Sequence, residues 1–442
     1  MGNRIRRNHL LTIVPYYSSG RLSQHLLWLA CLAGVAGLLA SRALVALSPV
    51  VGVLAALANP RLRHELPNYW RNGAALRAAA LPAFLVLSAA YTTEWASWRH
   101  ELFRMLPWLG VPLAFTLAVP LAARQRRAVS ELFALGTAAV GLATLGRFLR
   151  NPAAIDAIRM DQNQTAYTGV FHITFGVMLA LACFVALGLR RRPLAGRAER
   201  ALLLAAAGTA AVVLHALAYR TGLLAFYSIL LGLGIRQLAH GHWLAATGLA
   251  LALLAGPVLA YCSLESVRAR VGTTLWDFNQ YQEGRDLNQH SLGQRLAAIE
   301  TAGAVIREHW LLGVAPADAQ AAMRAQYEWK SFGLRPENRA ELHNQYLVAL
   351  LGGGVVGLVL WLALLLGPLA HRQLRRNPYV LLFIVIQAAT NLIDAALELQ
   401  TGLNLFVFGY GFLIVAGERY WQGRRTAVAA SPAQQLSAGQ PG

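Results

Sequence analysis

Charged residues are scarce in this chain of 442 residues. Only 13% of the residues are charged, whereas soluble domains carry about 25%. Apolar runs of roughly 20 residues, the length that a helix needs to cross a bilayer, recur along the whole sequence. The composition therefore excludes an ordinary soluble protein and predicts an all-α polytopic membrane protein. Alternating strands of the kind that build a membrane barrel are not seen, which disfavours that class.

Lysine and cysteine are also rare. Lys330 is the only lysine, so almost all of the net charge of +19 comes from arginine. In a soluble protein such a charge would suggest nucleic acid. Here the arginines cluster in connections between apolar runs, where they act as topology signals, and no separate basic domain is present. We therefore expect the lipid bilayer, and no nucleic acid, as a partner. Cys31, Cys183 and Cys262 lie within or at the end of apolar runs and form no disulfide framework.

Motifs for metals and nucleotides are missing as well. No D-x-D, no H-E-x-x-H and no Cys/His cluster occurs in the polar segments. The run Gly352-Gly353-Gly354 is not followed by the Lys-Ser/Thr pair that a phosphate-binding loop requires. We therefore expect no cofactor and no catalytic metal. With Gly357, this run instead has the small-residue spacing typical of close helix packing.

Twelve apolar spans are predicted along the chain. They cover residues 22–40, 43–59, 74–93, 105–123, 128–149, 166–189, 201–219, 221–238, 242–262, 342–368, 378–398 and 402–417. Arginines concentrate in alternate connections and in both terminal segments, so the positive-inside rule places both termini in the cytoplasm. The prediction divides the chain into spans one to nine (1–262), a large outer loop with amphipathic helices (263–341), spans ten to twelve (342–417) and a disordered cytoplasmic tail (418–442).

Two helices are predicted within the outer loop. The first runs from about residue 293 to 310, and the second from 317 to 329. Four residues of the first helix share one face at helical spacing: Leu296, Ile299, Ile306 and Trp310. Such helices are expected to lie on the outer membrane surface or to cap the bundle.

The stretch Glu341-Leu342-His343-Asn344 places a histidine at the start of span ten, in its predicted first turn at the outer interface. Histidine titrates near neutral pH and can take a proton from an attacking hydroxyl group. Glu341 or Asn344 is close enough in sequence to orient the ring. The alternative is that His343 only anchors the helix at the interface, with Glu341 and Asn344 as helix caps.

Four arginines near the outer face are candidates for binding an anionic substrate. Arg220 lies between two apolar spans, where a charge is costly unless it has a partner. Arg268 and Arg270 directly follow span nine, and Arg295 lies in the first loop helix. Guanidinium groups match phosphate oxygens in pairs, which suits a pyrophosphate. The alternative for most loop arginines is that they are solvated or paired with acids.

Asp394 is an acid inside span eleven. At a rise of about 1.5 Å per residue it lies roughly 24 Å from Pro378, toward the outer end of the span. Acids within membrane spans are candidates for a functional role. Asp394 is therefore predicted to pair with an arginine or to orient a substrate hydroxyl. A structural ion pair is the alternative.

Three short motifs resemble the O-antigen ligase/polymerase superfamily. The first is His343-Asn344-x-x-Leu347, which opens a span directly after one large outer loop. The second runs from Gly293-Gln294-Arg295 to His309-Trp310-Leu311-Leu312-Gly313-Val314. The third, Tyr219-Arg220-Thr221-Gly222, is similar to a small-residue-Arg-Gly element of that family, although Thr221 separates the arginine from the glycine.

The resemblance implies a metal-independent, GT-C-type glycosyltransferase in a bacterial inner membrane. Its donor would be a glycan on undecaprenyl pyrophosphate at the periplasmic face, and a ligase would transfer this glycan to lipid A–core to make lipopolysaccharide. By this resemblance His343 is the general base, and Arg220 holds the pyrophosphate with Arg268, Arg270 or Arg295. Asn344 and Asp394 are expected to bind substrate. Without a carboxylate pair spaced for double displacement, direct attack with inversion is the simpler mechanism.

Three other functions stay open. An O-antigen polymerase would use the same donor to extend a growing glycan, and a protein O-oligosaccharyltransferase would use a protein acceptor. The single large outer loop favours the ligase, because the second candidate loop, 150–165, is short. A transporter of lipid-linked glycans is disfavoured, because the polar residues gather at the outer face and no internal repeat is present.

Overall fold

The computed structural model describes residues 15–151, 153–159, 165–191 and 196–424, which form helices and connecting segments without a strand in these ranges. Of the tail that was predicted to be disordered, residues 418–424 continue the last helix, and 425–442 lie outside the described residues. The all-α prediction is confirmed for the described part of the chain.

Within the described ranges, eight helices are long and apolar enough to cross a membrane. They are α2 (Arg21–Ala40), α8 (Ala123–Leu149), α10 (His172–Arg190), α11 (Arg197–Ala216), α12 (Arg220–Ala239), α13 (Trp243–Ser263), α17 (Gln345–Leu366) with η3 (Gly367–Ala370), and α20 (Gln400–Gly409), which continues through η5 (Tyr410–Val415) to Arg424. Shorter apolar helices are α3 (Arg42–Leu57), α5 (Gly73–Ser88) and α19 (Pro378–Ile393). The protein is a multi-pass membrane protein.

The predicted number of twelve spans is not confirmed. The range 105–123 contains only α7 (Pro107–Leu117). This helix ends because Ala118 is extended and Pro120 follows two residues later, and the residue before a proline avoids helical geometry. Hydropathy detects the apolar run but not the point where the backbone leaves the helix.

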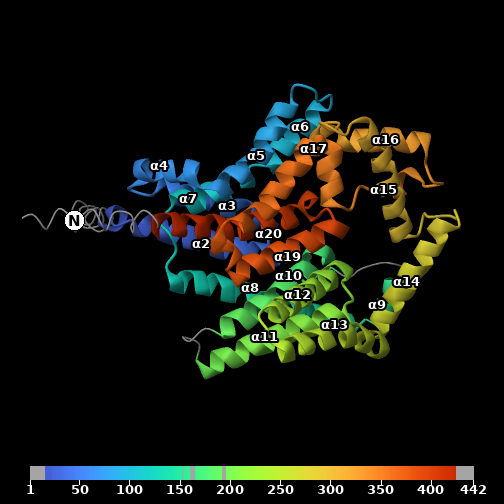
Figure 1. Ribbon diagram of the computed structural model, residues 1–442, viewed down its shortest axis with the longest axis horizontal. Coiled ribbons are helices and arrows are strands. Elements are labelled where there is room, and N and C mark those ends of the chain that lie inside the picture. Colours follow the sequence, from blue (N-terminus) through green and yellow to red (C-terminus); the bar gives the residue numbers. More distant parts are fainter. Residues whose placement is uncertain (1–14, 152, 160–164, 192–195, 425–442) are drawn as a thin grey trace, which may run out of the picture.

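The remaining elements are short or lie outside the apolar helices. They are α4 (Leu62–Arg71), α6 (Trp95–Arg104), α9 (Ala154–Arg159), α14 (Glu265–Gln282), α15 (Ser291–Glu308), η1 (Pro316–Asp318), α16 (Ala319–Trp329), η2 (Pro336–Asn338), α18 (Arg372–Arg375) and η4 (Ala396–Glu398). Figure 1 shows α14, α15 and α16 together at one end of the bundle, whereas α4 lies toward the other end.

Helix α10 is the centre of the bundle. Most of its side chains are buried, and it packs against α8, α11, α12 and α19. A Cβ atom at Gly222 would come within 2.6 Å of the backbone of Gly176, so α10 and α12 approach closely only through glycine. This contact brings the first residues of both helices, His172 and Arg220, to the same end of the bundle.

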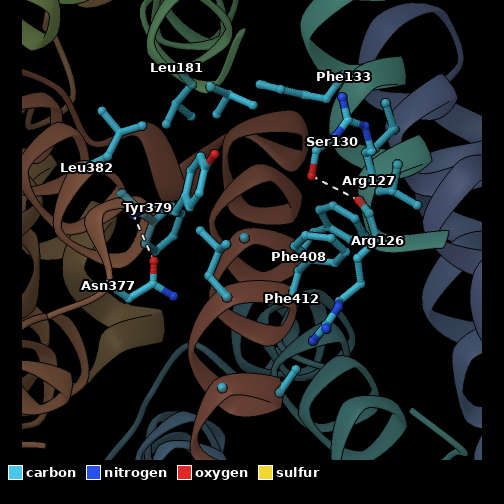
Figure 2. Close-up of a pocket in the computed structure, with 18 of the residues that line it drawn as sticks. Arg126, Arg127, Ser130, Phe133, Leu181, Asn377, Tyr379, Leu382, Phe408 and Phe412 are labelled. Carbon is cyan, nitrogen blue, oxygen red and sulfur yellow. Dashed lines mark hydrogen bonds between the residues drawn. The ribbon is translucent and has the colours of Figure 1, made fainter. Parts of the chain in front are cut away.

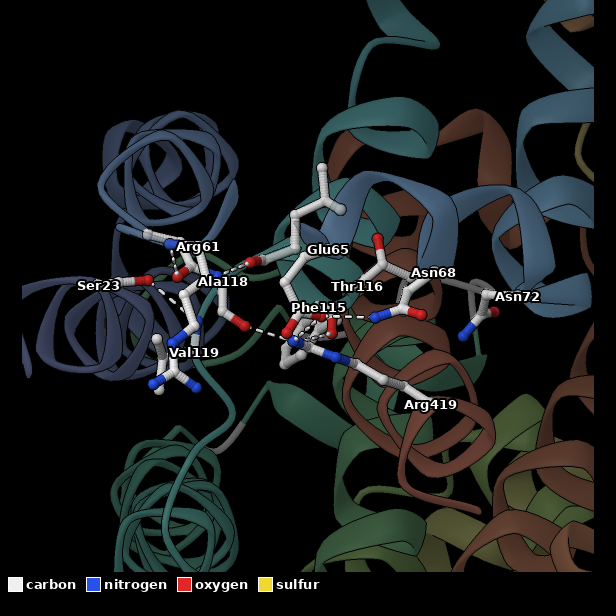
Figure 3. A network of polar contacts seen from close by, with 12 residues as sticks. Ser23, Arg61, Glu65, Asn68, Asn72, Phe115, Thr116, Ala118, Val119 and Arg419 are labelled. Atoms are coloured by element: carbon white, nitrogen blue, oxygen red, sulfur yellow. Dashed lines mark hydrogen bonds and ion pairs between the residues drawn. The ribbon is translucent and has the colours of Figure 1, made fainter. Parts of the chain in front are cut away.

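A polar network holds the opposite end of the bundle together (Figure 3). Arg419 donates hydrogen bonds to the carbonyl groups of Phe115 and Ala118 and pairs with Glu65 at 2.9 Å. Glu65 also accepts a hydrogen bond from Asn68 at 2.6 Å. Because a cation inside a membrane bundle is costly without partners, this arginine joins α4, the end of α7 and the last helix.

The outer loop is attached to the bundle through Asp318. Its carboxylate accepts hydrogen bonds from the Thr92 hydroxyl and from the Thr93 hydroxyl and backbone N–H. Burial by itself raises the pKa of Asp318, but these hydrogen bonds and one from the Glu94 N–H lower the pKa below its usual value. The loop helices are thereby anchored to the segment that follows α5.

Two of the four apolar residues that were predicted to share one helix face are exposed. Ile299 and Trp310 are 42% and 58% exposed. The side chains that pack inward are small: Gly293, Ala297, Ala298, Thr301, Ala302 and Val305. Helix α15 packs against α14, α16 and α17. Small side chains allow close approach, and the larger Ile306 is partly buried against the same cluster.

One glycine of the run in α17 has a role beyond the predicted close helix packing, which Gly353 shows against Phe84 of α5. Gly354 leaves the helix with φ 57° and ψ −155°. The N–H group of Val355 then donates to the carbonyl of Trp310 at 2.9 Å. A Cβ atom at Gly354 would lie 2.3 Å from the backbone of Leu311. The glycines therefore open α17 so that the backbone of the outer loop can bond to it.

We expect Gly354→Ala to destabilise the protein by roughly 1–3 kcal/mol, because only glycine adopts this backbone geometry readily. Thermal unfolding of the purified protein in detergent measures the effect as a lower melting temperature. Gly232→Ala in α12 is the control, because no atom lies within 4 Å of a Cβ at that position. Equal melting temperatures for the two variants would contradict the role given to Gly354.

Candidate functional site

The carboxylate of Asp394 is the centre of the site. It is 1% exposed. His343 Nδ1 lies 3.1 Å and Arg295 Nη2 lies 3.4 Å from its Oδ1 atom. The Thr221 hydroxyl donates to Oδ2. Three segments, namely the start of α12, α15 and the residues before α17, therefore converge on one buried charge.

His343 and Asp394 both lie outside the helices in which they were predicted. Helix α17 begins at Gln345, so His343 precedes its N-cap residue, Asn344. Helix α19 ends at Ile393, and Asp394 is extended with φ −146° and ψ 149°. These non-helical segments meet, because Asn344 Nδ2 donates to the carbonyl of Leu392 at 2.8 Å. Asn344 therefore caps α17 and joins it to the end of α19.

Arg295 is positioned through a carboxylate that the sequence analysis did not single out. Asp277 on α14 is fully buried, accepts a hydrogen bond from the Leu292 N–H at 3.0 Å and contacts His290 Nδ1 at 2.8 Å. It satisfies an amide in the first turn of α15, as a capping side chain does. Arg295 lies one turn further on and donates to the Ile393 carbonyl at 3.0 Å. No local sequence pattern reveals a cap that comes from another helix.

Arg268 and Arg270 have different surroundings. Two residues apart on a helix, they point about 200° away from each other. Arg270 is only 4% exposed. Arg268 is paired with Glu265 at 2.6 Å and donates to the Cys262 carbonyl at 2.7 Å. The structure therefore places the Arg268 side chain with Glu265 and the end of α13, and its predicted catalytic role stays a prediction.

Arg220 lies beside the turn of α14 that carries Arg270. It is the first residue of α12, and its Nη1 atom is 3.4 Å from the hydroxyl oxygen of Thr274. The same hydroxyl donates to the Arg270 carbonyl at 2.7 Å. Arg220, Arg270 and Arg295 thus approach the site from α12, α14 and α15.

His172 is a further member of the site that the sequence analysis missed. It begins α10 and is half-buried, and its ring centroid lies 4.2 Å from that of Phe171 and 6.2 Å from that of Tyr219. The charges that act on its ring are those of Asp394, Arg270, Arg295 and Arg220. The sequence shows His172 only as a polar residue within a predicted apolar span, so its neighbours could not be inferred.

The site lies at the end of the bundle opposite the arginine-rich connections. Helix α19 begins at Pro378, directly after the connection that contains α18, and ends beside Asp394. Its 16 residues span about 24 Å. The loop helices α14 to α16 gather at this same end (Figure 1).

The charges of the site suit an anionic ligand. Arg295 contacts the Asp394 carboxylate, and Arg220 and Arg270 lie near the same site. Guanidinium groups bind phosphate oxygens in pairs. Within the described ranges, no three His, Cys, Asp or Glu side chains gather as metal ligands would. The arginines are therefore the groups of this site that suit such a ligand.

Residues 202–362 match the model of the family described as O-antigen ligase. Over these residues the chain is similar to that family. The match supports the resemblance at the level of the O-antigen ligase/polymerase superfamily, and it runs from within α11 to the last turns of α17. It includes Arg220, Arg270, Arg295 and His343, whereas Asp394 lies beyond it. No curated protein matches the chain.

We expect Asp277→Ala to release the first turn of α15 and with it Arg295. Loss of the cap leaves an amide without its partner and destabilises the protein by about 1–2 kcal/mol. Hydrogen exchange measures the local effect as faster exchange in residues 290–296. Asp286→Ala is the control, because that carboxylate bonds only within the exposed turn of Asn288. Unchanged exchange in Asp277→Ala would contradict this role.

Proposed function

We propose that the protein is an O-antigen ligase of the bacterial inner membrane. It transfers a glycan from undecaprenyl pyrophosphate to a sugar hydroxyl of lipid A–core at the periplasmic face. The contact of His343 with Asp394 beside three arginines is the observation that carries this proposal. The family match and the positive-inside rule support it.

His343 acts as the general base in this proposal. With Nδ1 bonded to the Asp394 carboxylate, the ring carries its proton on that nitrogen and leaves the lone pair of Nε2 for the acceptor. The His343 side chain is 35% exposed, so Nε2 can meet a substrate. A carboxylate that stays ionised also stabilises the imidazolium that forms during transfer, as in a catalytic triad.

The bond changes follow from this geometry. Nε2 takes the proton of the acceptor hydroxyl, whose oxygen attacks the anomeric carbon of the donor glycan. The bond from that carbon to the pyrophosphate oxygen breaks, and the electron pair leaves with undecaprenyl pyrophosphate. Arg220, Arg270 and Arg295 stabilise the negative charge of this leaving group.

Asp394 is already engaged with His343 and Arg295, so we assign it an orienting role rather than that of a nucleophile. Direct attack inverts the anomeric configuration, and a product with retained configuration would contradict this step. The arginines take the place that a metal has in other transferases, so transfer should persist in EDTA. A loss of activity that a divalent ion restores would contradict metal independence.

A polymerase of the same superfamily would use the same donor, and a gel of lipopolysaccharide separates the two reactions. In a strain without this gene, a ligase leaves core without O-antigen while long chains accumulate on undecaprenyl pyrophosphate. A polymerase leaves core that bears one repeat unit. An unchanged pattern would contradict both and would favour protein glycosylation or transport.

We expect His343→Gln to abolish transfer, with a loss of at least about 100-fold, because general bases contribute on the order of 10²–10⁴. Transfer is measured with purified protein, lipid-linked donor and lipid A–core. His309→Gln is the control, because His309 is exposed at the end of α15. Full activity of His343→Gln would exclude it as the base.

Arg270→Ala and Arg268→Ala form a second matched pair. Arg270 is buried toward the site and Arg268 pairs with Glu265, so only Arg270→Ala should reduce kcat/KM by about tenfold or more. The same transfer assay measures both variants, and their melting temperatures show whether they fold. Equal losses would contradict the assignment of Arg270 to the pyrophosphate.

A further inference from the structure

A cavity of about 430 Å³ lies at the arginine-rich end of the bundle. It is enclosed by α2, α8, α10, α19 and the last helix. Its inner wall is apolar and includes Leu38, Phe133, Leu181, Val185 and Phe408. A cavity with such a wall suits a hydrocarbon chain.

The same cavity also has polar residues, which come from the first turns of two helices. Figure 2 shows Asn377 and Tyr379 of α19 on one side and Arg126 and Ser130 of α8 on the other. The first turns of α8 and α19 carry the positive ends of their helix dipoles. The cavity is therefore apolar inside and polar where these helices begin.

Arg126 supplies the positive charge of this polar part. It is exposed, and within the described ranges no acidic side chain pairs with it. The neighbouring Arg127 is different, because it pairs with Glu131 at 2.6 Å and also with Glu199. The charge of Arg127 is thus balanced within the protein, whereas that of Arg126 is available to an anion.

A second cation stands next to the cavity. The Cζ atom of Arg424 lies 5.7 Å from the ring centroid of Tyr420 and 5.8 Å from that of Trp421. Both rings line the cavity. Aromatic and arginine side chains together are common at the headgroup level of a membrane.

The cavity is separate from the transfer site. Tyr379 lies at the start of α19, whereas Asp394 follows its last residue. Helix α10 likewise contributes Leu189 to the cavity and His172 to the site. Along each helix, the polar end of the cavity is therefore more than about 20 Å from the site.

We propose that this cavity binds an anionic phospholipid of the cytoplasmic leaflet. One acyl chain lies along the apolar wall, and the phosphate group contacts Arg126. Basic pockets between helices on the cytoplasmic side bind lipid headgroups in this way. A neutral polyprenyl tail has no charged group for Arg126, and a free phosphate ion would leave the apolar wall uncovered.

The test uses native mass spectrometry of the full-length protein in detergent. Phosphatidylglycerol and phosphatidylcholine with identical acyl chains are added in turn. We expect retention of phosphatidylglycerol over phosphatidylcholine, and we expect Arg126→Gln to weaken phosphatidylglycerol binding about fivefold. Arg124→Gln is the matched control, because Arg124 lies in the same turn but does not line the cavity.

A second variant tests the apolar part. Val185→Trp fills the cavity and should remove bound phosphatidylglycerol without changing the charge. Melting temperatures show that each variant is folded. Equal retention of both lipids, an equal effect of Arg124→Gln, full binding by Val185→Trp, or recovery of a neutral polyprenyl lipid instead would each overturn the proposal.

Discussion

Asp394 is a carboxylate buried at the end of a membrane helix, and such a charge is costly unless partners surround it. Its partners come from segments far apart in the sequence: Thr221, Arg295 and His343. Several other features of the structure follow from the need of the Asp394 carboxylate for these partners. Helix α15 must point Arg295 toward the carboxylate, and Asp277 fixes the start of that helix. The same requirement places the imidazole next to the arginines.

Non-helical backbone at the outer end makes this arrangement possible. Irregular backbone is tolerated at membrane depth only where protein covers it and satisfies its polar groups. Asn344 satisfies a backbone carbonyl where α17 and α19 meet. At η4, Arg104 donates to the Leu397 carbonyl at 2.7 Å and pairs with Glu398 at 2.8 Å. Further along α17, Gly354 lets the loop backbone bond directly to the helix. The outer loop is thus joined to the bundle by backbone contacts as well as by side chains.

Arginine serves different purposes at the two ends of the molecule. At the end that holds Asp394, Arg295 contacts the carboxylate and Arg220 and Arg270 lie nearby, and this set of guanidinium groups suits a phosphate-bearing substrate. At the opposite end Arg419 and Arg127 are balanced by glutamates and hold helices together. Arg126 is exposed beside the apolar cavity and is available to a lipid headgroup. Residue type alone does not distinguish these roles, because they depend on which acids lie nearby.

The sequence by itself determined the helical membrane class, the arginine-rich connections and the presence of helices near 293–310 and 317–329, because these follow from composition and periodicity along the chain. It also singled out Arg220 and Asp394, because a charge within or beside an apolar run needs a partner, and His343, because a titratable ring stands at the start of a span, whereas Arg295 was named through the family resemblance. Only the tertiary structure decided where α17 and α19 end, which face of α15 is buried, and that Arg270 rather than Arg268 faces the bundle. It also added His172 and Asp277. These features depend on contacts between residues distant in the chain, which periodicity cannot detect.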